Sequence, residues 1–251
     1  MFDPLPKPVV DTDIKEPSYV SQDGFEKVPI IRGFYEIEPL FNTIKKYSGM
    51  LMGGYVRWMC SPADQPILPG DIDVYFCSEG DYDRCKEDLL NEGLQVKHEN
   101  VVSCTFAKAT VDSKYRGCPD IQLIKPIEEG NILTMGSMES ILDNFDFSVV
   151  RAGVINKHTA MVDKDFLHDE ARKILRLKNI HCPVGSTLRC MKYSKKGYWL
   201  PPTQVFRLFV DWDNRTAEYK EKLYDFVTKA NDGTGLSQKE IDEMEAMFRV
   251  D

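Results

Sequence analysis

This sequence lacks several features that mark well-defined classes of protein. Its seven cysteines are odd in number and form no C-x-x-C pair, which argues against a disulfide framework and a zinc ribbon. It contains no long uncharged apolar run, and its first residues have neither the basic start nor the apolar core of a signal peptide. We therefore expect a cytoplasmic protein that makes no contact with a membrane.

Positive charge is also scarce. The 251 residues include 32 Lys and Arg against 40 Asp and Glu, so the net charge is −8. This balance argues against a protein that coats nucleic acid over its whole surface, because affinity for phosphates grows with the number of cations presented. The stretch 171–200 is the exception, with eight basic and no acidic residues. It is compatible with a narrow polyanion site or with ordinary solvated surface.

The chain divides into three parts by its patterns. Residues 1–28 mix prolines and charges with few apolar positions, so we expect an extended N-terminal arm. Residues 29–164 alternate helix-like and strand-like segments, which predicts one α/β or α+β domain, and we take α+β as the fold class. Residues 165–251 have helical periodicity, and helices are expected at 165–178, 185–196, 202–211, 216–230 and 237–248. The last of these begins with a capping box, Ser237 and Glu240.

Aromatic residues gather between residues 199 and 212. Trp199, Phe206, Phe209 and Trp212 alternate there with aliphatic residues. This spacing favours the core of a helical domain over a platform on which bases stack.

Two aspartates interrupt an otherwise apolar strand, "DIDVYF" at 71–76. Alternate residues of a strand point to the same face, so the side chains of Asp71 and Asp73 project together. Adjacent carboxylates repel each other unless a cation lies between them, and oxygen ligands suit Mg²⁺ or Mn²⁺. Asp120, at the head of the apolar strand "DIQLIK", is the candidate third carboxylate of a two-metal site.

A glycine pair precedes this strand. In "MLMGGYVRWMC" a short strand is expected to end at Gly53 and Gly54, and a helix to follow. Residues without a β-carbon allow backbone N–H groups to approach phosphates, and Arg57 is placed to reach phosphate or an aspartate. A glycine pair alone is usually a turn, and D-x-D often marks a strand end. In this order, however, the two indicate a metal-dependent nucleotidyl-transfer site.

The series of motifs resembles the nucleotidyltransferases of the DNA polymerase β superfamily, within it the bacterial poly(A) polymerase and CCA-adding type. "GGYVRW" with "DIDVYF" is similar to that family's GG-x-V-R-D and D-x-D. "NFDFSVVRAGV", "DFLHDEARKILRL" and "TLRCMKYSKKGY" are similar to its later segments. The resemblance implies a polymerase β-like head over 29–164, a mixed sheet flanked by helices, followed by an α-helical neck over 165–251.

The resemblance also implies roles for single residues. Asp71 and Asp73, with Asp120 as the third carboxylate, would be catalytic and would hold two Mg²⁺ or Mn²⁺ ions. Nucleotide would be bound by Gly53, Gly54, Arg57, Asp146, Arg189 and Lys192. RNA would be bound by Arg172, Lys173, Arg176, Lys178, Lys195 and Lys196. For Asp146 the alternative is a buried acid that only pins the neck.

The chain departs from the family pattern at several positions. Trp58 stands where the family usually has Asp, and the family's base-reading Asp and Arg fall near Pro183 and Ser186. We expect transfer of a nucleoside monophosphate from an NTP to a hydroxyl, with the 3′ end of a tRNA-like RNA as the preferred acceptor. The alternatives are a protein, small-molecule or nucleotide acceptor, as in a toxin or defence factor, and a non-catalytic nucleotide- or RNA-binding module.

Overall fold

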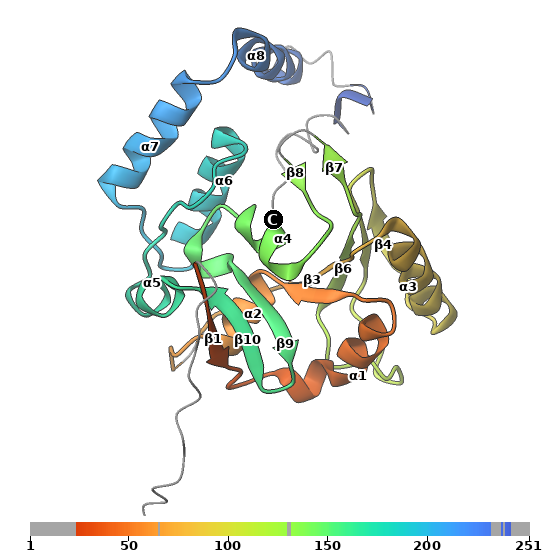
Figure 1. Ribbon diagram of the computed structural model, residues 1–251. Coiled ribbons are helices and arrows are strands. Elements are labelled where there is room, and N and C mark those ends of the chain that lie inside the picture. The colour runs from red at the N-terminus through yellow and green to blue at the C-terminus, as the bar shows by residue number, and fades with distance from the viewer. Residues whose placement is uncertain (1–23, 65, 130–131, 232–236, 238, 242–251) are drawn as a thin grey trace, which may run out of the picture.

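An eight-stranded mixed sheet forms the centre of the protein (Figure 1). The structure, a computed structural model, describes residues 24–231 except 65, 130 and 131, and then residues 237 and 239–241. The strand order is β1-β10-β9-β2-β3-β6-β5-β4. The strands are β1 Phe25–Pro29, β2 Met50–Met52, β3 Asp71–Tyr75, β4 Val96–Glu99, β5 Ser103–Phe106, β6 Asp120–Ile124, β9 Ala152–Asn156 and β10 Thr159–Asp163. A separate hairpin pairs β7 Glu128–Glu129 with β8 Ile132–Leu133.

One face of the sheet, here called the helical face, is covered by three helices. These are α1 Phe34–Lys45, α2 Gly54–Cys60 and α3 Glu79–Asn91. Their apolar residues form one core with Ile72 and Val74 of β3 and with Ile121 of the neighbouring strand β6. Burial of these branched side chains fixes the orientation of β3, because a slip by one residue would send its carboxylates into the core.

The other face, here called the second face, carries a smaller core. Helix α4, Met138–Asp143, and the short 3₁₀ helix η1, Ser148–Val150, pack there over Met52 and Tyr75. Helix α6 of the neck contributes Cys190 and Tyr193 to the same core. Head and neck are therefore joined by shared apolar packing.

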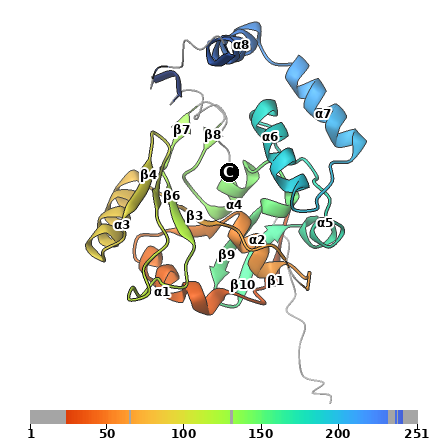
Figure 2. The same cartoon turned by 180° about the vertical axis from the view of Figure 1, so that it is seen from behind.

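The C-terminal part is helical. Helix α5 spans Phe166–Arg172, α6 Pro183–Ser194, α7 Pro202–Asp213 and α8 Ala217–Asn231. Figures 1 and 2 show α7 and α8 following one another in an arc that is farther from the sheet than α5 and α6. In the part of the chain that the structure describes, no helix has the length and hydrophobicity needed to cross a bilayer.

The expected α+β fold class is confirmed, with a mixed sheet, flanking helices and a helical neck. The assignment of the first 28 residues to an arm needs correction, since Phe25–Pro29 pairs with β10 as an edge strand. Of that arm, residues 1–23 lie outside the described residues. Helix α5 ends earlier than expected because Lys173 adopts a left-handed conformation, with φ 55°, and Ile174 then bridges to Trp199.

The two remaining expectations for the neck have different outcomes. The capping box is confirmed: the Ser237 N–H donates to Glu240 Oε2 at 2.9 Å, and the Glu240 N–H donates to Ser237 Oγ at 3.3 Å. Most of the helix that it begins lies outside the described residues. The expectation of an aromatic core is wrong for Trp199, Phe206 and Phe209, which are 51%, 68% and 67% exposed. The buried stripe of α7 is carried by Leu208 instead.

Gly33 is the position where a side chain is excluded most strictly. Its φ is +72°, and a β-carbon there would lie 2.0 Å from the Trp58 ring. We predict that Gly33→Ala lowers the free energy of unfolding by about 1–3 kcal/mol, because backbone strain adds to overpacking. Gly80→Ala is the matched control: Gly80 lies in α3 with no atom within 4 Å of its β-carbon position, so the change should be neutral or stabilising. Urea unfolding of both variants measures the difference, and equal midpoints would contradict the prediction.

Candidate active site

Asp71 and Asp73 lie together on the second face of the sheet at the beginning of β3. Both are half-buried, while Ile72 between them is fully buried on the helical face. Met52, the residue before the glycine pair, is the register partner of Asp73. The antiparallel pairing of β2 with β3 therefore brings the glycine turn beside the two carboxylates, as the sequence predicted.

The two glycines have different roles in the turn. Gly53 has φ 81° and ψ −144°, a conformation open only to glycine. Its N–H donates to the carbonyl of Ala152 at 2.8 Å, and the expected binding of phosphate by the glycine backbone stays a prediction. Gly54 begins α2, and a β-carbon there would meet only the Tyr193 hydroxyl, at 3.9 Å. The open backbone of the turn thus belongs to Gly54 and faces helix α6.

Asp120 lies next to Asp71 but has other partners. Strands β3 and β6 are parallel, with Asp71 and Asp120 in register. The Asp120 carboxylate accepts hydrogen bonds from Lys97 Nζ at 2.5 Å and from the Lys108 N–H at 2.8 Å. The Lys97 hydrogen bond lowers the pKa of Asp120, against an opposing effect of burial. Among the described residues, no three His, Cys, Asp or Glu form a group that could hold a metal, so the role of Asp120 as third metal ligand stays a prediction.

Arg57 is buried inside the protein, where only 1% of it is exposed. Its Nη1 donates to Glu170 Oε1 at 3.3 Å and to the Tyr198 hydroxyl at 2.8 Å. The same carboxylate accepts from Ser61 Oγ at 2.6 Å, from Lys173 Nζ at 2.7 Å and from the Tyr198 hydroxyl. Arg57 thus joins α2 to the neck, and its expected role in supporting the triphosphate stays a prediction.

Asp146 is buried at the junction of head and neck. Arg189 of α6 donates from Nε to Asp146 Oδ2 at 2.6 Å. Burial raises the pKa of Asp146, while the charge of Arg189 opposes this shift. The Asp146 carbonyl also accepts the Lys178 N–H at 2.7 Å. This geometry matches the alternative in which Asp146 pins the neck, and it ties Arg189 to that task.

Half of the cations expected to bind RNA are engaged in ion pairs. Lys173 pairs with Glu170, Arg176 with Asp169 and Asp165, and Lys178 with Asp163 and Asp165. Lys196 places its amino group 4.9 Å from the centre of the Tyr193 ring. Arg172, Lys192 and Lys195 are exposed and form no ion pair with any described residue. The free basic surface is therefore smaller than the sequence suggested.

The sequence analysis missed Glu170, Tyr193 and Tyr198. One signal for the first was available: Arg57 stands in an otherwise apolar helix, and a buried cation needs a buried acid. The chain carries 40 acidic residues, so the sequence could not indicate which of them pairs with Arg57. Tyr193 and Tyr198 gave no signal, because their positions against Gly54 and Arg57 arise only from the docking of the neck.

The solved structures to which this chain is similar include a tRNA-processing enzyme and CCA-adding enzymes. A tRNA-processing enzyme in its apo form I superposes with a TM-score of 0.50 at 13% identity, over 71% of this chain and 47% of that one. It shows the shared fold. A CCA-adding enzyme with CTP gives a TM-score of 0.48 at 15% identity, over 72% and 45% of the two chains. The Thermotoga maritima CCA-adding enzyme complexed with tRNA gives 0.48 at 14% identity, over 74% and 45%.

A similar curated protein is "Gabija anti-defense 2" of Bacillus phage SPbetaL7. It is 23% identical over 190 residues, which are 75% of this chain and 43% of that protein. The chain therefore spans less than half the length of this relative and of the solved structures above. No protein-family model matches the sequence.

The Arg57 contact generates a stability prediction. We expect Arg57→Met to lower the free energy of unfolding by about 3–5 kcal/mol, because it leaves the buried Glu170 carboxylate without its guanidinium partner. The loss of unfolding free energy in the double variant Arg57→Met/Glu170→Met should be smaller than the sum of the losses in the two single variants. Arg84→Met, which removes an exposed partner of Asp81, should change stability by less than about 1 kcal/mol. Thermal unfolding of the parent, Arg57→Met, Glu170→Met, the double variant and Arg84→Met measures these losses, and a loss for Arg57→Met as small as that for Arg84→Met would refute the assignment.

Asp169 generates a pH prediction. Burial alone would raise its pKa, but hydrogen bonds from Arg176 and Ser148 bring the pKa below its usual value. Its stabilising contribution is therefore complete above the unfolded pKa, near 4, and is lost as the pH falls through the lower folded value. We expect Asp169→Asn to cost about 1.5–3 kcal/mol at pH 7. The gap between variant and parent should narrow on acidification below about pH 4. Denaturant unfolding across this range is the measurement, and a constant gap would argue against the prediction.

Proposed function

We propose that this protein is a metal-dependent nucleotidyltransferase that moves a nucleoside monophosphate from an NTP to a hydroxyl group and releases pyrophosphate. The observation that carries the proposal is the register of β2 with β3, which sets Asp71 and Asp73 beside the Gly53–Gly54 turn on one face of the sheet. The fold shared with a tRNA-processing enzyme supports it.

Asp71 and Asp73 fit a hard divalent cation. They are two half-buried carboxylates on the same face of one strand, and Mg²⁺ is commonly held by one or two carboxylates together with substrate phosphates and water. Two such carboxylates therefore suffice without Asp120. Two Mg²⁺ or Mn²⁺ ions bound there would neutralise charge on the triphosphate and activate the acceptor hydroxyl.

Other residues would bind and orient the substrates. Gly54 offers open backbone to the triphosphate, since only the Tyr193 hydroxyl lies near its missing β-carbon. Arg57 acts as a positioning residue, because its contact with Glu170 holds α2 against the neck. Lys192, exposed on α6, is the candidate cation for the nucleotide or the primer. Each of these groups belongs to α2 or α6, so the substrate would lie between head and neck.

The preferred acceptor is the 3′ end of an RNA. The exposed cations Arg172, Lys192 and Lys195 remain available to a phosphate backbone. Such a small set suits the end of an RNA better than a long track, because affinity for a polyanion rises with each neutralised phosphate.

A second candidate acceptor is a protein, a small molecule or another nucleotide, as in a defence-type enzyme. Two observations favour it. Lys173, Arg176 and Lys178 are engaged in ion pairs, on a chain whose net charge is −8. The relative named Gabija anti-defense 2 points to a role in conflict between phage and host.

The proposal predicts incorporation of label that depends on Asp71 and Asp73. The purified protein is incubated with Mg²⁺ or Mn²⁺, each α-labelled NTP in turn, and total cellular RNA, protein and small molecules as acceptors. Asp71→Asn and Asp73→Asn should each lower incorporation by about 10²–10³-fold, the loss that follows removal of a group stabilising transition-state charge. Asp83→Asn, the same change on the exposed surface of α3, should leave the rate unchanged.

The acceptor that carries the label decides between the two candidates. Label in RNA supports the first, and label in protein or a small product supports the second. Absence of label with every NTP and acceptor, together with Mg²⁺-independent thermal stabilisation by an NTP, would overturn the catalytic proposal in favour of a nucleotide-binding module.

A further inference from the structure

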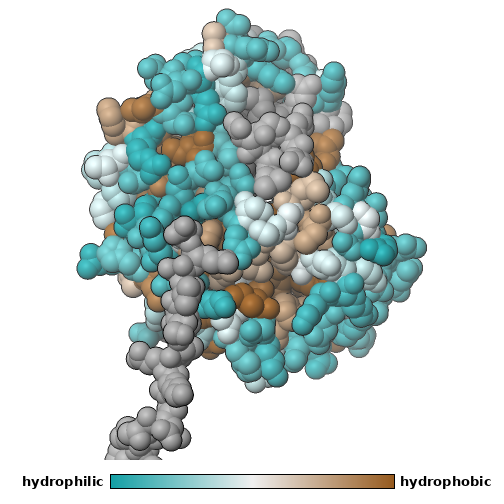
Figure 3. Space-filling view, in the orientation of Figure 1, coloured by the Kyte–Doolittle hydropathy of each residue, from teal (hydrophilic) through white to brown (hydrophobic). Residues whose placement is uncertain are grey.

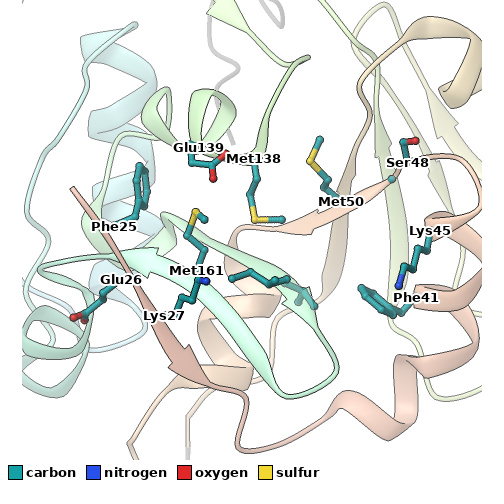
Figure 4. Close-up of a pocket in the computed structure, with 13 residues that line it drawn as sticks. Phe25, Glu26, Lys27, Phe41, Lys45, Ser48, Met50, Met138, Glu139 and Met161 are labelled. Carbon is teal, nitrogen blue, oxygen red and sulfur yellow. The ribbon is translucent and has the colours of Figure 1, made fainter. Parts of the chain in front are cut away.

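A pocket of about 580 Å³ is lined by Met50, Met138 and Met161 of the second face and by Phe41 and Lys45 of α1 (Figure 4). It is lined by Ser48 and Gly49, which precede β2, and by Met50, the first residue of β2, whereas the glycine turn follows the end of that strand. Met52 and Tyr75 lie between the two regions and are 0% and 2% exposed, packed under α4. The pocket is therefore separate from the candidate active site.

The walls of the pocket are apolar and come from distant parts of the chain. Its main apolar residues are Phe25, Phe41, Met50, Met138, Val154 and Met161. The three methionines belong to β2, α4 and β10, and Figure 4 shows their side chains gathered around one space. Figure 3 shows hydrophobic surface in the middle of this side of the molecule, bordered by hydrophilic residues. Methionine side chains are flexible and polarisable, so such walls adapt to apolar ligands of different shape.

Met138 can line the pocket because the residue beneath it in the sheet is a glycine, Gly153. It lies over Gly153 of β9, where a β-carbon would be 2.6 Å from its Sδ. The first turn of α4 can therefore approach the sheet closely at this point. The hollow is bounded by secondary structure on several sides, a form typical of ligand pockets, whose volumes are about 300–1,000 Å³.

The charges around the pocket favour an anion. Lys27 of β1 and Lys45 of α1 line it from opposite sides, and neither has a carboxylate partner among the described residues. Glu26 points away from the space in Figure 4, and its pKa is raised by burial and then by the charges of Asp163 and Asp165. Glu139 is the remaining acid, at the start of α4. Two cations without a carboxylate partner among the described residues thus line an apolar hollow, and of its two lining acids Glu26 has its side chain turned away.

We propose that this pocket binds a small amphipathic anion, an apolar chain or ring that carries one carboxylate or phosphate group. The apolar part would lie among the methionines, and the anionic group would pair with Lys27 or Lys45. The binding free energy would come from burial of apolar surface, and the lysines would select the charge. This site is independent of the proposed nucleotidyl transfer.

Three molecules with the same chain and different head groups test the proposal. Octanoate, 1-octanol and octylamine are titrated into the full-length protein by isothermal calorimetry, below their aggregation concentrations. Octanoate should bind with 1:1 saturation and at least about 10-fold more tightly than octylamine, a difference of about 1.4 kcal/mol. Octanol should lie between them. Vesicles of phosphatidylglycerol should not sediment the protein, because the ligand is a free molecule and not a membrane.

Variants then locate the site. Lys27→Gln/Lys45→Gln should reduce octanoate affinity to that of octanol, while Lys157→Gln, at an exposed position outside the pocket, should not change it. Met161→Trp should fill the pocket and abolish binding of all three molecules. Ile155→Glu also tests whether the ligand lies in this pocket, and it leaves the core intact because Ile155 is a lining residue that is 37% exposed. The added carboxylate should reverse the preference, so that octylamine binds more tightly than octanoate.

Several results would overturn the proposal. They are no saturable binding of octanoate, equal affinity for octanoate and octylamine, sedimentation with vesicles without binding of the free molecule, or octanoate binding that survives Ile155→Glu unchanged. Loss of nucleotidyl transfer in the Asp71 variant would not bear on any of these results, so the two proposals fail separately.

Discussion

The buried contact between Arg57 and Glu170 is the constraint on which the arrangement of head and neck depends. Both side chains are almost fully buried, and removal of two charges from water is unfavourable unless each is paired and hydrogen-bonded. Ser61, Lys173 and Tyr198 supply the further hydrogen bonds. These groups come from α2, from α5 with the residue after it, and from the segment after α6. The network is complete only when the neck docks in one position.

That position has a direct consequence for the candidate active site. Because α2 is held against the neck, Gly54 at its first residue faces Tyr193 of α6, and Arg189 of the same helix reaches Asp146. The glycine turn itself is fixed from the other side by the bond between Gly53 and Ala152. The contacts Arg57–Glu170, Arg189–Asp146 and Gly53–Ala152 thus together fix the positions of the elements between which we propose that a nucleotide and an acceptor bind.

The two faces of the sheet carry different chemistry. The helical face is filled with branched and aromatic side chains, which hold the strands in register. The second face is divided by Met52 and Tyr75 under α4, with the carboxylates of β3 at one end and the methionine-lined pocket at the other. The two sites that we propose on this head therefore differ in chemistry, one with carboxylates for cations and one with apolar walls for an amphipathic anion.

Local patterns in the sequence determined the elements and the central motif. Alternation in "DIDVYF" placed Asp71 and Asp73 on one face, and the glycine pair marked the turn before α2, because both features depend only on neighbouring residues. The short strand β1 was missed, since its pairing partner β10 is more than 130 residues away along the chain. The tertiary structure alone decided which partners the charged side chains take. Arg57 pairs with Glu170, Asp120 pairs with Lys97, and half of the cations in the basic segment pair with acidic residues. The reason is that a buried or half-buried charge needs a partner, and only the fold determines which opposite charge lies close to it.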